Sequence, residues 1–287
     1  MSSFRPFPIP VVPLVGPGSQ PDDETPDFLP MPSDMSTYRP PVLPEPEELA
    51  AHGGAVAALR AALAALRERG AGGDPAPVDL AHLTDADRAL VNQVLGEGEV
   101  AAQVTGPNGV QAQESVFAGV WRVLYLEDGH VVRDTLEVGP VPAVLLQAAQ
   151  VDAATMPSPV LARPADTMNA PSLMEELVDQ SRRWQPGAPP HVVNLTLLPL
   201  TPGDSLYLDS QLGAGRVLIL SRGYGNCRVV DTRLPHTWRV TYFNSQDLII
   251  LDTLEVAAVP EVACAAPEDL ADSAERLAEV LAWVERA

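Results

Sequence analysis

The chain has 287 residues, of which 46% are hydrophobic, 5% are aromatic and 30 are proline. This composition excludes a wholly disordered chain, and the prolines predict long extended stretches beside the folded part. The formal net charge of −20 argues against binding nucleic acid or an anionic membrane through bulk charge. The same charge fits either a basic partner or an ordinary acidic soluble protein.

Two cysteines, Cys227 and Cys264, are too few for a disulfide framework, which fits a reducing compartment. No apolar run approaches the ~20 residues of a membrane span, so no membrane insertion is expected. Proline occupies four of the first 13 positions and would break a signal-peptide helix. We therefore expect a cytoplasmic protein.

Residues 1–44 form a Pro-rich extended arm, because each proline removes a backbone donor and favours extended geometry in the residue before it. The arm carries more apolar side chains than a typical solvating tail: Phe4, Phe7, Ile9, Val11, Val12, Phe28, Met31 and Tyr38. A disordered tail and an arm packed on the body or on a partner both remain open.

Residues 45–70 predict a helix or a kinked pair of helices with a break at Gly53-Gly54. The spacing of Val56, Leu59 and Leu63 gives this segment one apolar face. The glycines and prolines of residues 70–77 then predict a flexible link.

An internal repeat follows. Leu83–Glu127 aligns with the residues 117 positions later with 12 identities in 45, and Asp134–Val144 aligns with those 118 positions later with 8 in 11. This similarity predicts a duplication. We expect three parts: the arm 1–44, a helix plus first copy at 45–165, and a second copy at 166–287.

Each copy has the same expected local structure. Thr84 and Thr201 are candidate N-caps with an aspartate three residues on, and a Leu-Gly-x-Gly turn then leads from helix to strand. In the second copy, strands are expected at 217–221, 227–231, 238–243 and 248–256, which suggests an antiparallel meander. A closing helix is expected after Pro267, and its equivalent in the first copy is expected at 172–184.

The predicted fold class is therefore α+β. It consists of two similar lobes, each a short helix plus an antiparallel sheet covered by a helix, with the Pro-rich N-terminal arm. Trp121 with Trp238, Arg122 with Arg239, and the repeated Asp-Thr-Leu-Glu-Val strand occur in both copies. We interpret these shared residues as scaffold.

No enzyme signature is found. The five histidines are scattered without metal spacing, and the sequence has no HExxH, GxSxG, P-loop or CxxC pattern. Gly223 and Gly225 lack the third glycine of a dinucleotide motif and lead into a strand. We expect no catalytic residues, no cofactor and no metal, with Cys227 as the one weak metal candidate.

The loop at 222–228 is the leading candidate for partner binding, because the first copy has Gly106-Pro-Asn-Gly-Val110 in its place. Its candidate residues are Arg222, Tyr224, Asn226, Cys227 and Arg228. The functional interpretation is a recognition loop whose thiol lies near a metal site of the partner. The structural interpretation is a tight turn with a buried cysteine.

Three acids near the start of the closing helix, Glu268, Asp269 and Asp272, form a second candidate. Their position complements the helix dipole, which is a structural role. Contact with a basic partner is the functional alternative.

Long stretches of the sequence resemble one family. They are SRGYGNCRV (221–229), TWRVTYFNS (237–245), ILDTLEV (250–256) and VPEVACAAPEDLADSAERL (259–277), together with Gly16–Gln20 and Leu95–Val100. They are similar to the HupH/HyaF/HoxQ proteins of nickel–iron hydrogenase maturation. The resemblance covers nearly the whole chain.

The resemblance implies an accessory protein with a chaperone-like role. Its expected partner is the precursor of the hydrogenase small subunit, which carries the iron–sulfur clusters, held before assembly with the large subunit and export. A thioredoxin-like maturation companion is a further expected partner. One alternative is an iron–sulfur scaffold or transfer factor using Cys227 and Cys264, although two thiols per chain fall short of the usual four ligands. A structural component of the assembled complex is another.

Overall fold

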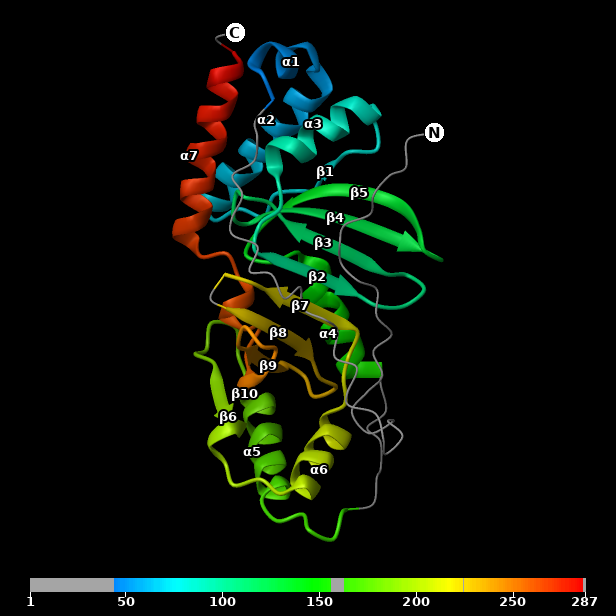
Figure 1. Cartoon of the computed structure of the whole chain (residues 1–287), viewed down its shortest axis with the longest axis vertical. Coiled ribbons are helices and arrows are strands. Elements are labelled where there is room, and N and C mark those ends of the chain that lie inside the picture. Colours follow the sequence, from blue (N-terminus) through cyan, green and yellow to red (C-terminus); the bar gives the residue numbers. More distant parts are fainter. Residues whose placement is uncertain (1–43, 156–162, 224, 286–287) are drawn as a thin grey trace. The chain divides into compact units, whose positions relative to one another are not determined.

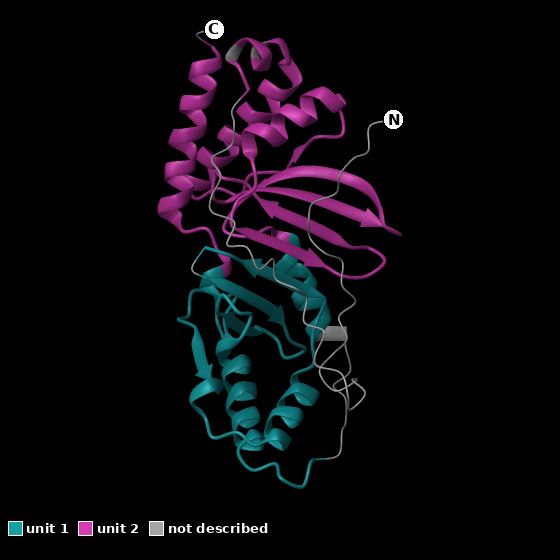
Figure 2. Cartoon of the chain, viewed as in Figure 1, with its two compact units in different colours: residues 1–35, 144–262 teal, residues 36–143, 263–287 magenta. Residues whose placement is uncertain are grey.

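The computed structural model describes residues 44–155, 163–223 and 225–285, so nearly all of the expected arm lies outside the described residues. The fold is α+β with antiparallel strands, as the sequence predicts (Figure 1). The described residues divide into two compact units, which Figure 2 shows in different colours. One unit holds residues 144–262, and the other holds residues 44–143 together with 263–285.

The unit of residues 44–143 and 263–285 covers one face of a sheet with helices. Its elements are α1 (Pro46–Ala51), α2 (Gly53–Gly70), β1 (Val78–Asp79), α3 (Asp85–Leu95), β2 (Val100–Val104), β3 (Val110–Glu114), β4 (Val120–Glu127), β5 (His130–Val138) and α7 (Pro267–Val284). Its strands lie in the order β1-β5-β4-β3-β2 and pair antiparallel. Leu59, Val91 and Leu277 from the three long helices share a buried core with Leu136 of β5.

The unit of residues 144–262 contains five further strands. Its elements are α4 (Ala143–Thr155), α5 (Ala170–Arg183), β6 (His191–Asn194), η1 (Leu195–Leu197), α6 (Pro202–Leu212), β7 (Val217–Ser221), β8 (Asn226–Asp231), β9 (Thr237–Phe243), β10 (Ile249–Val256) and η2 (Glu261–Ala263). The strand order is β7-β8-β9-β10-β6, again antiparallel. Leu177 of α5, Leu208 of α6 and Leu254 of β10 are buried together.

Most of the expected elements are confirmed. Helices α1 and α2 break between Ala51 and Gly53, and β7 to β10 match the four expected strands within a residue or two. Two expectations about the helices are wrong. The segment at 172–184 does form a helix, α5, but the helix that directly follows the first meander is α4, where no helix was expected. Pro140 and Pro142 precede α4 and are compatible with a helix that begins after them.

The compact units also differ from the successive segments 45–165 and 166–287. Helix α4 follows the first meander but belongs to the unit of the second, whereas α7 follows the second meander and belongs to the unit of the first. The closing helix was expected to cover the sheet that it follows, and this expectation is wrong. The division at residue 165 stays a prediction about sequence repeats.

The expected N-caps and glycine turns are present. The Thr84 hydroxyl accepts a hydrogen bond from the Asp87 N–H, and Thr201 forms a reciprocal capping box with Asp204. The helices end at Gly96 and Gly213, whose φ angles of 58° and 60° favour glycine. Both turns therefore lead from helix to strand in the same way.

An arginine–aspartate fork ties a helix to the central hairpin in each unit. Arg122 Nε and Nη2 donate to Asp134 Oδ1 and Oδ2 at 3.0 and 2.8 Å, and Nη1 donates to Asn92 of α3. Such a two-pronged charged contact fixes the orientation of both side chains. The fork therefore joins β4, β5 and α3.

The second fork has the same form. Arg239 Nε and Nη2 donate to Asp252 at 3.0 and 2.7 Å, and Nη1 donates to Asp209 of α6. Behind each fork the indole N–H of a buried tryptophan donates to a backbone carbonyl just beyond the hairpin, Trp121 to Gly139 and Trp238 to Ala257. The scaffold role expected for these residues agrees with this geometry.

Replacing Asp134 with alanine leaves Arg122 buried without its carboxylate, so the free energy of unfolding of this unit should fall by about 3–5 kcal/mol. Asp252→Ala is the matched variant. Its loss should be smaller, because the Arg239 side chain is 34% exposed against 9% for Arg122 and keeps Asp209. Urea denaturation followed by hydrogen exchange in β4 and β9 reports each unit separately. Equal losses would contradict this reasoning.

Candidate functional site

Two hairpin tips lie at one end of the β7–β10 sheet. Asn226 at the start of β8 and Ile249 at the start of β10 both lie opposite Phe243, the last residue of β9. The β7–β8 loop and the β9–β10 loop are therefore neighbours at this end of the sheet. We call this region the tip end of the unit.

The predicted recognition loop, residues 222–228, forms the first tip. Arg222 is exposed in the turn, Asn226 is half-buried, and Gly225 has a φ of 105°, while Tyr224 lies outside the described residues. Arg228 does not project into solvent, because its guanidinium lies 5.5 Å from the centroid of the Phe243 ring. Burial, with the nearby Arg239, lowers the pKa of Arg228. Arg222 is thus the exposed polar residue among the described residues of the loop, and Asn226 and Arg228 are half-buried.

Cys227 agrees with the structural interpretation of a buried thiol and not with a thiol exposed to a partner's metal site. Its side chain is 0% exposed on β8. Burial raises the pKa of Cys227 to about 12, and the nearby Glu255 carboxylate acts in the same direction. A thiol must lose its proton to bind a metal, so this cysteine is poorly suited to contact a metal site of a partner.

The second tip exposes three apolar side chains in sequence. Leu248, Ile249 and Ile250 are 59%, 50% and 57% exposed. Asn244 holds the loop, since its side-chain Oδ1 accepts the Leu248 N–H at 3.0 Å and its own N–H donates to the Leu248 carbonyl at 2.9 Å. From the sequence, residues 248–256 are expected only to form a strand. A run of three large apolar residues beside a turn was the signal available there.

The acidic candidates Glu268, Asp269 and Asp272 are exposed near the start of α7. They belong to the unit of residues 44–143 and 263–285, whereas the loop at 222–228 belongs to the other unit. Asp272 makes a 3.5 Å ion pair with Arg276 one turn along the same helix. Their placement agrees with the dipole role and leaves the partner role a prediction.

A buried carboxyl lies near the end of the second strand of each meander. Glu114 Oε1 accepts the Gly119 N–H at 3.0 Å, and Asp231 Oδ1 accepts the Val217 N–H at 2.9 Å. Burial raises the pKa of each group to about 7. Asp152 of α4 raises that of Asp231 further.

Among the described residues, no group of three or more histidine, cysteine or acidic side chains is arranged to hold a metal ion. Cys264 is half-buried just before α7, and neither cysteine forms a disulfide. No helix in the described ranges is both long enough and apolar enough to cross a bilayer.

One known protein family matches most of the chain. The family described as "HupH hydrogenase expression protein, C-terminal conserved region" matches residues 54–160 and 167–284. The chain belongs to the HupH family. That membership confirms the resemblance found from the sequence.

Relatives within the HupH family match most of the chain. It is 54% identical over 279 residues to the hydrogenase expression/formation protein HoxQ of Cupriavidus necator, covering 97% of this chain and 98% of that protein. It is 36% identical to the hydrogenase-1 operon protein HyaF of Escherichia coli, covering 96% of each. The solved hydrogenase expression protein HupH from Thiobacillus denitrificans is 29% identical, with a TM-score of 0.37 over 40% of this chain and 95% of that one.

The two buried carboxyls predict a pH dependence of stability. Because their folded pKa values lie above the ordinary 4.5 and 3.8, their protonated forms favour the folded state at low pH. Stability should therefore fall as pH rises from about 4 to about 7, by on the order of 3 kcal/mol for each group. Glu114→Gln and Asp231→Asn should each remove that group's contribution to the pH dependence of stability. The free energy of unfolding in urea should then differ less between pH 5 and pH 8 than in the parent protein. A pH difference as large as that of the parent protein would contradict the assignment.

Proposed function

We propose that this HupH-family chain is a hydrogenase maturation protein that binds the precursor of the hydrogenase small, iron–sulfur subunit before that subunit meets the large one. The names of its relatives, hydrogenase expression/formation proteins, support the maturation role. The small subunit as client rests on the family resemblance. The observation that carries a binding role is the exposed apolar tip at Leu248, Ile249 and Ile250.

The apolar tip is suited to contact another polypeptide. Burying one large aliphatic side chain stabilises a complex by about 1.5–3 kcal/mol, and soluble proteins rarely expose such groups together without a function. At the start of β5 in the other unit the apolar run is only two residues long, because Val131 and Val132 lie between His130 and Arg133. The uninterrupted apolar run thus occurs in one tip of the pair.

The edge of β10 offers a second means of contact. Strand β6 pairs with Thr253–Val256, and within the described residues no strand pairs with Ile249–Leu251 on that side. An extended client segment can add to such an edge through backbone hydrogen bonds. The net charge of −20 favours clients with a basic segment.

A binding role of this kind needs no catalytic residues and no cofactor of its own. It places the protein in the cytoplasm, where the precursor is made, and leaves room for a thioredoxin-like companion on the same client. Arg222 and Asn226 would supply polar contacts beside the apolar tip, and the acids of α7 remain candidates for a separate basic contact.

The alternative is an iron–sulfur scaffold or transfer factor. The buried thiol of Cys227, with its raised pKa, argues against direct cluster ligation in this conformation. Anaerobic reconstitution with iron and sulfide separates the two functions. A Cys227→Ser variant that loads and delivers clusters as the parent does would exclude the scaffold.

We also infer that the two units arose by duplication of one segment. The matching forks, the paired tryptophan hydrogen bonds and the two matched ranges, 54–160 and 167–284, support this inference. The sequence halves 45–165 and 166–287 would then be the duplicated pieces, each with its last helix in the other compact unit.

Co-purification from hydrogenase-expressing cells tests the proposal. The small-subunit precursor should be recovered with the tagged protein, and recovery of the large subunit alone would contradict the proposal. Replacing Ile250 with aspartate should weaken binding of the purified precursor at least tenfold, because it places a charge in the apolar contact.

Val132→Asp is the matched control for that variant, since Val132 is 55% exposed at the corresponding tip of the other unit. Isothermal titration with both variants should show a loss for Ile250→Asp only. Equal affinities for the two variants and the parent would show that the apolar tip does not bind the client.

A further inference from the structure

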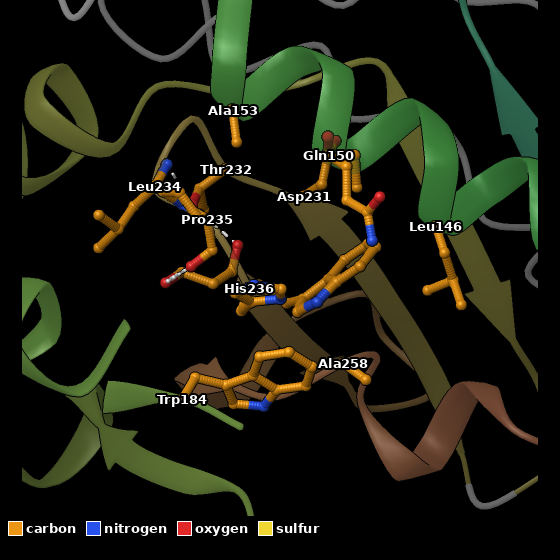
Figure 3. A pocket seen from close by; sticks show the side chains of 13 residues that line it. Leu146, Gln150, Ala153, Trp184, Asp231, Thr232, Leu234, Pro235, His236 and Ala258 are labelled. Carbon is orange, nitrogen blue, oxygen red and sulfur yellow. Dashed lines mark hydrogen bonds between the residues drawn. The ribbon is translucent and has the colours of Figure 1, made fainter. Parts of the chain in front are cut away.

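A cavity of about 180 Å³ opens between α4 and the β8–β9 turn, inside the unit of residues 144–262 (Figure 3). Apolar side chains form most of its wall. They are Leu146, Ala149 and Ala153 of α4, with Trp184, Leu234, Pro235, Trp238 and Ala258. The polar residues that line it are Gln150, Asp231, Thr232, His236 and Thr237. Such a mainly apolar wall with few polar groups is typical of a ligand pocket.

One wall is a stacked pair of planar rings. The rings of Trp184 and His236 lie 3.8 Å apart between centroids with an interplanar angle of 20°. The turn that carries His236 is fixed on both sides: the Ser181 hydroxyl donates to the Pro235 carbonyl at 2.7 Å, and the Ala257 N–H donates to the His236 carbonyl at 2.8 Å. The wall is therefore held in place from α5 and from the end of β10.

His236 has a backbone conformation that normally favours glycine, with φ at 56°. In the repeat alignment its counterpart is Gly119, with φ at 77°. A side chain retained in such a conformation suggests that the imidazole itself is needed. The ring nitrogens of His236 make no hydrogen bond to any residue in the described ranges.

Different side chains lie beside the turn that carries Gly119 and the turn that carries His236. At Gly119 a Cβ atom would lie 2.1 Å from Leu270 Cδ2, so an apolar side chain of α7 closes that space. Beside His236, α4 instead presents the small side chains of Ala149 and Ala153. The turn with the imidazole is thus the one that keeps a cavity.

The volume and the walls point to one class of ligand. A dry apolar cavity of about 150 Å³ is sufficient to bind benzene. Burial lowers the pKa of His236, so its ring is neutral near pH 7 and can both donate and accept a hydrogen bond. A flat ring gains from packing on the flat Trp184–His236 wall.

We propose that this cavity binds a single aromatic ring bearing a hydroxyl or ring N–H, packed between α4 and the Trp184–His236 stack and hydrogen-bonded to His236. This inference does not depend on the identity of the client or on the maturation role. The site lies in the same unit as the apolar tip but at the other end of its strands, beside the β8–β9 turn.

Titration of the full chain with p-cresol, followed by NMR, tests the proposal. The indole N–H signal of Trp184 and the imidazole signals of His236 should shift together and saturate. Isoamyl alcohol, an aliphatic probe with a hydroxyl, should bind at least tenfold more weakly. Absence of saturable shifts, shifts confined to other residues, or equal binding of the two probes would overturn the proposal.

Two variants locate the site. His236→Gly removes the imidazole but tolerates the positive φ, and Ala153→Leu fills the cavity from α4. Each should weaken p-cresol binding at least tenfold. Gln147→Leu adds a similar apolar side chain to an exposed position of α4 outside the cavity and should leave binding unchanged. Parent-like binding by both site variants, with parent-like melting temperatures, would also overturn the proposal.

A third probe separates the two possible sources of the ring. N-acetyl-tyrosine amide carries the same phenol on a peptide backbone. Tighter binding than p-cresol supports a ring supplied by a polypeptide, and weaker binding supports a free small molecule. Both results support the aromatic site, since both require the phenol to occupy it.

Discussion

The arginine–aspartate fork is the contact on which each sheet depends. The N–H groups of a buried or half-buried guanidinium need hydrogen-bond acceptors. In each unit an aspartate on the adjacent strand and one acceptor on a helix accept from the arginine. The fork therefore fixes the register of the hairpin and the position of α3 or α6 at once. Misplacing either would leave an unpaired charge inside the protein.

This anchoring divides the β7–β10 unit into two ends with different properties. Near the fork, capping hydrogen bonds, a tryptophan and the β8–β9 turn make a rigid frame, which holds the cavity beside α4. At the tip end, the loops carry exposed apolar and polar side chains with few tertiary contacts to lose. Contact surfaces placed on loops over a rigid frame can change without loss of the fold.

Local signals in the sequence were enough for much of this architecture. The caps at Thr84 and Thr201, the glycines at 96 and 213 and the four strands follow from short-range hydrogen bonding and side-chain alternation, and the structure has them. The sequence left both a buried and an exposed Cys227 open, because the burial depends on what packs against β8. Helix α4 was missed since prolines precede it and no capping signal marks its start.

The site residues illustrate the same limit. Arg228 reads as a free donor in the sequence, yet its packing on Phe243 is a cross-strand contact that only the register of β8 and β9 determines. In the sequence, His236 is one of five scattered histidines without metal spacing. The role proposed for His236 rests on its positive φ angle and on its stacking against Trp184, which is distant in the sequence. A histidine aligned with Gly119 was the available sequence signal.

The crossing of α4 and α7 between the units has a consequence for synthesis on the ribosome. The unit that contains α1, α2 and α3 begins first but needs Leu270, Leu277 and Leu281 of α7 to complete its core. Those residues are made after all of residues 44–262. Residues 44–143 must therefore wait, with apolar helix faces uncovered, until α7 has been made.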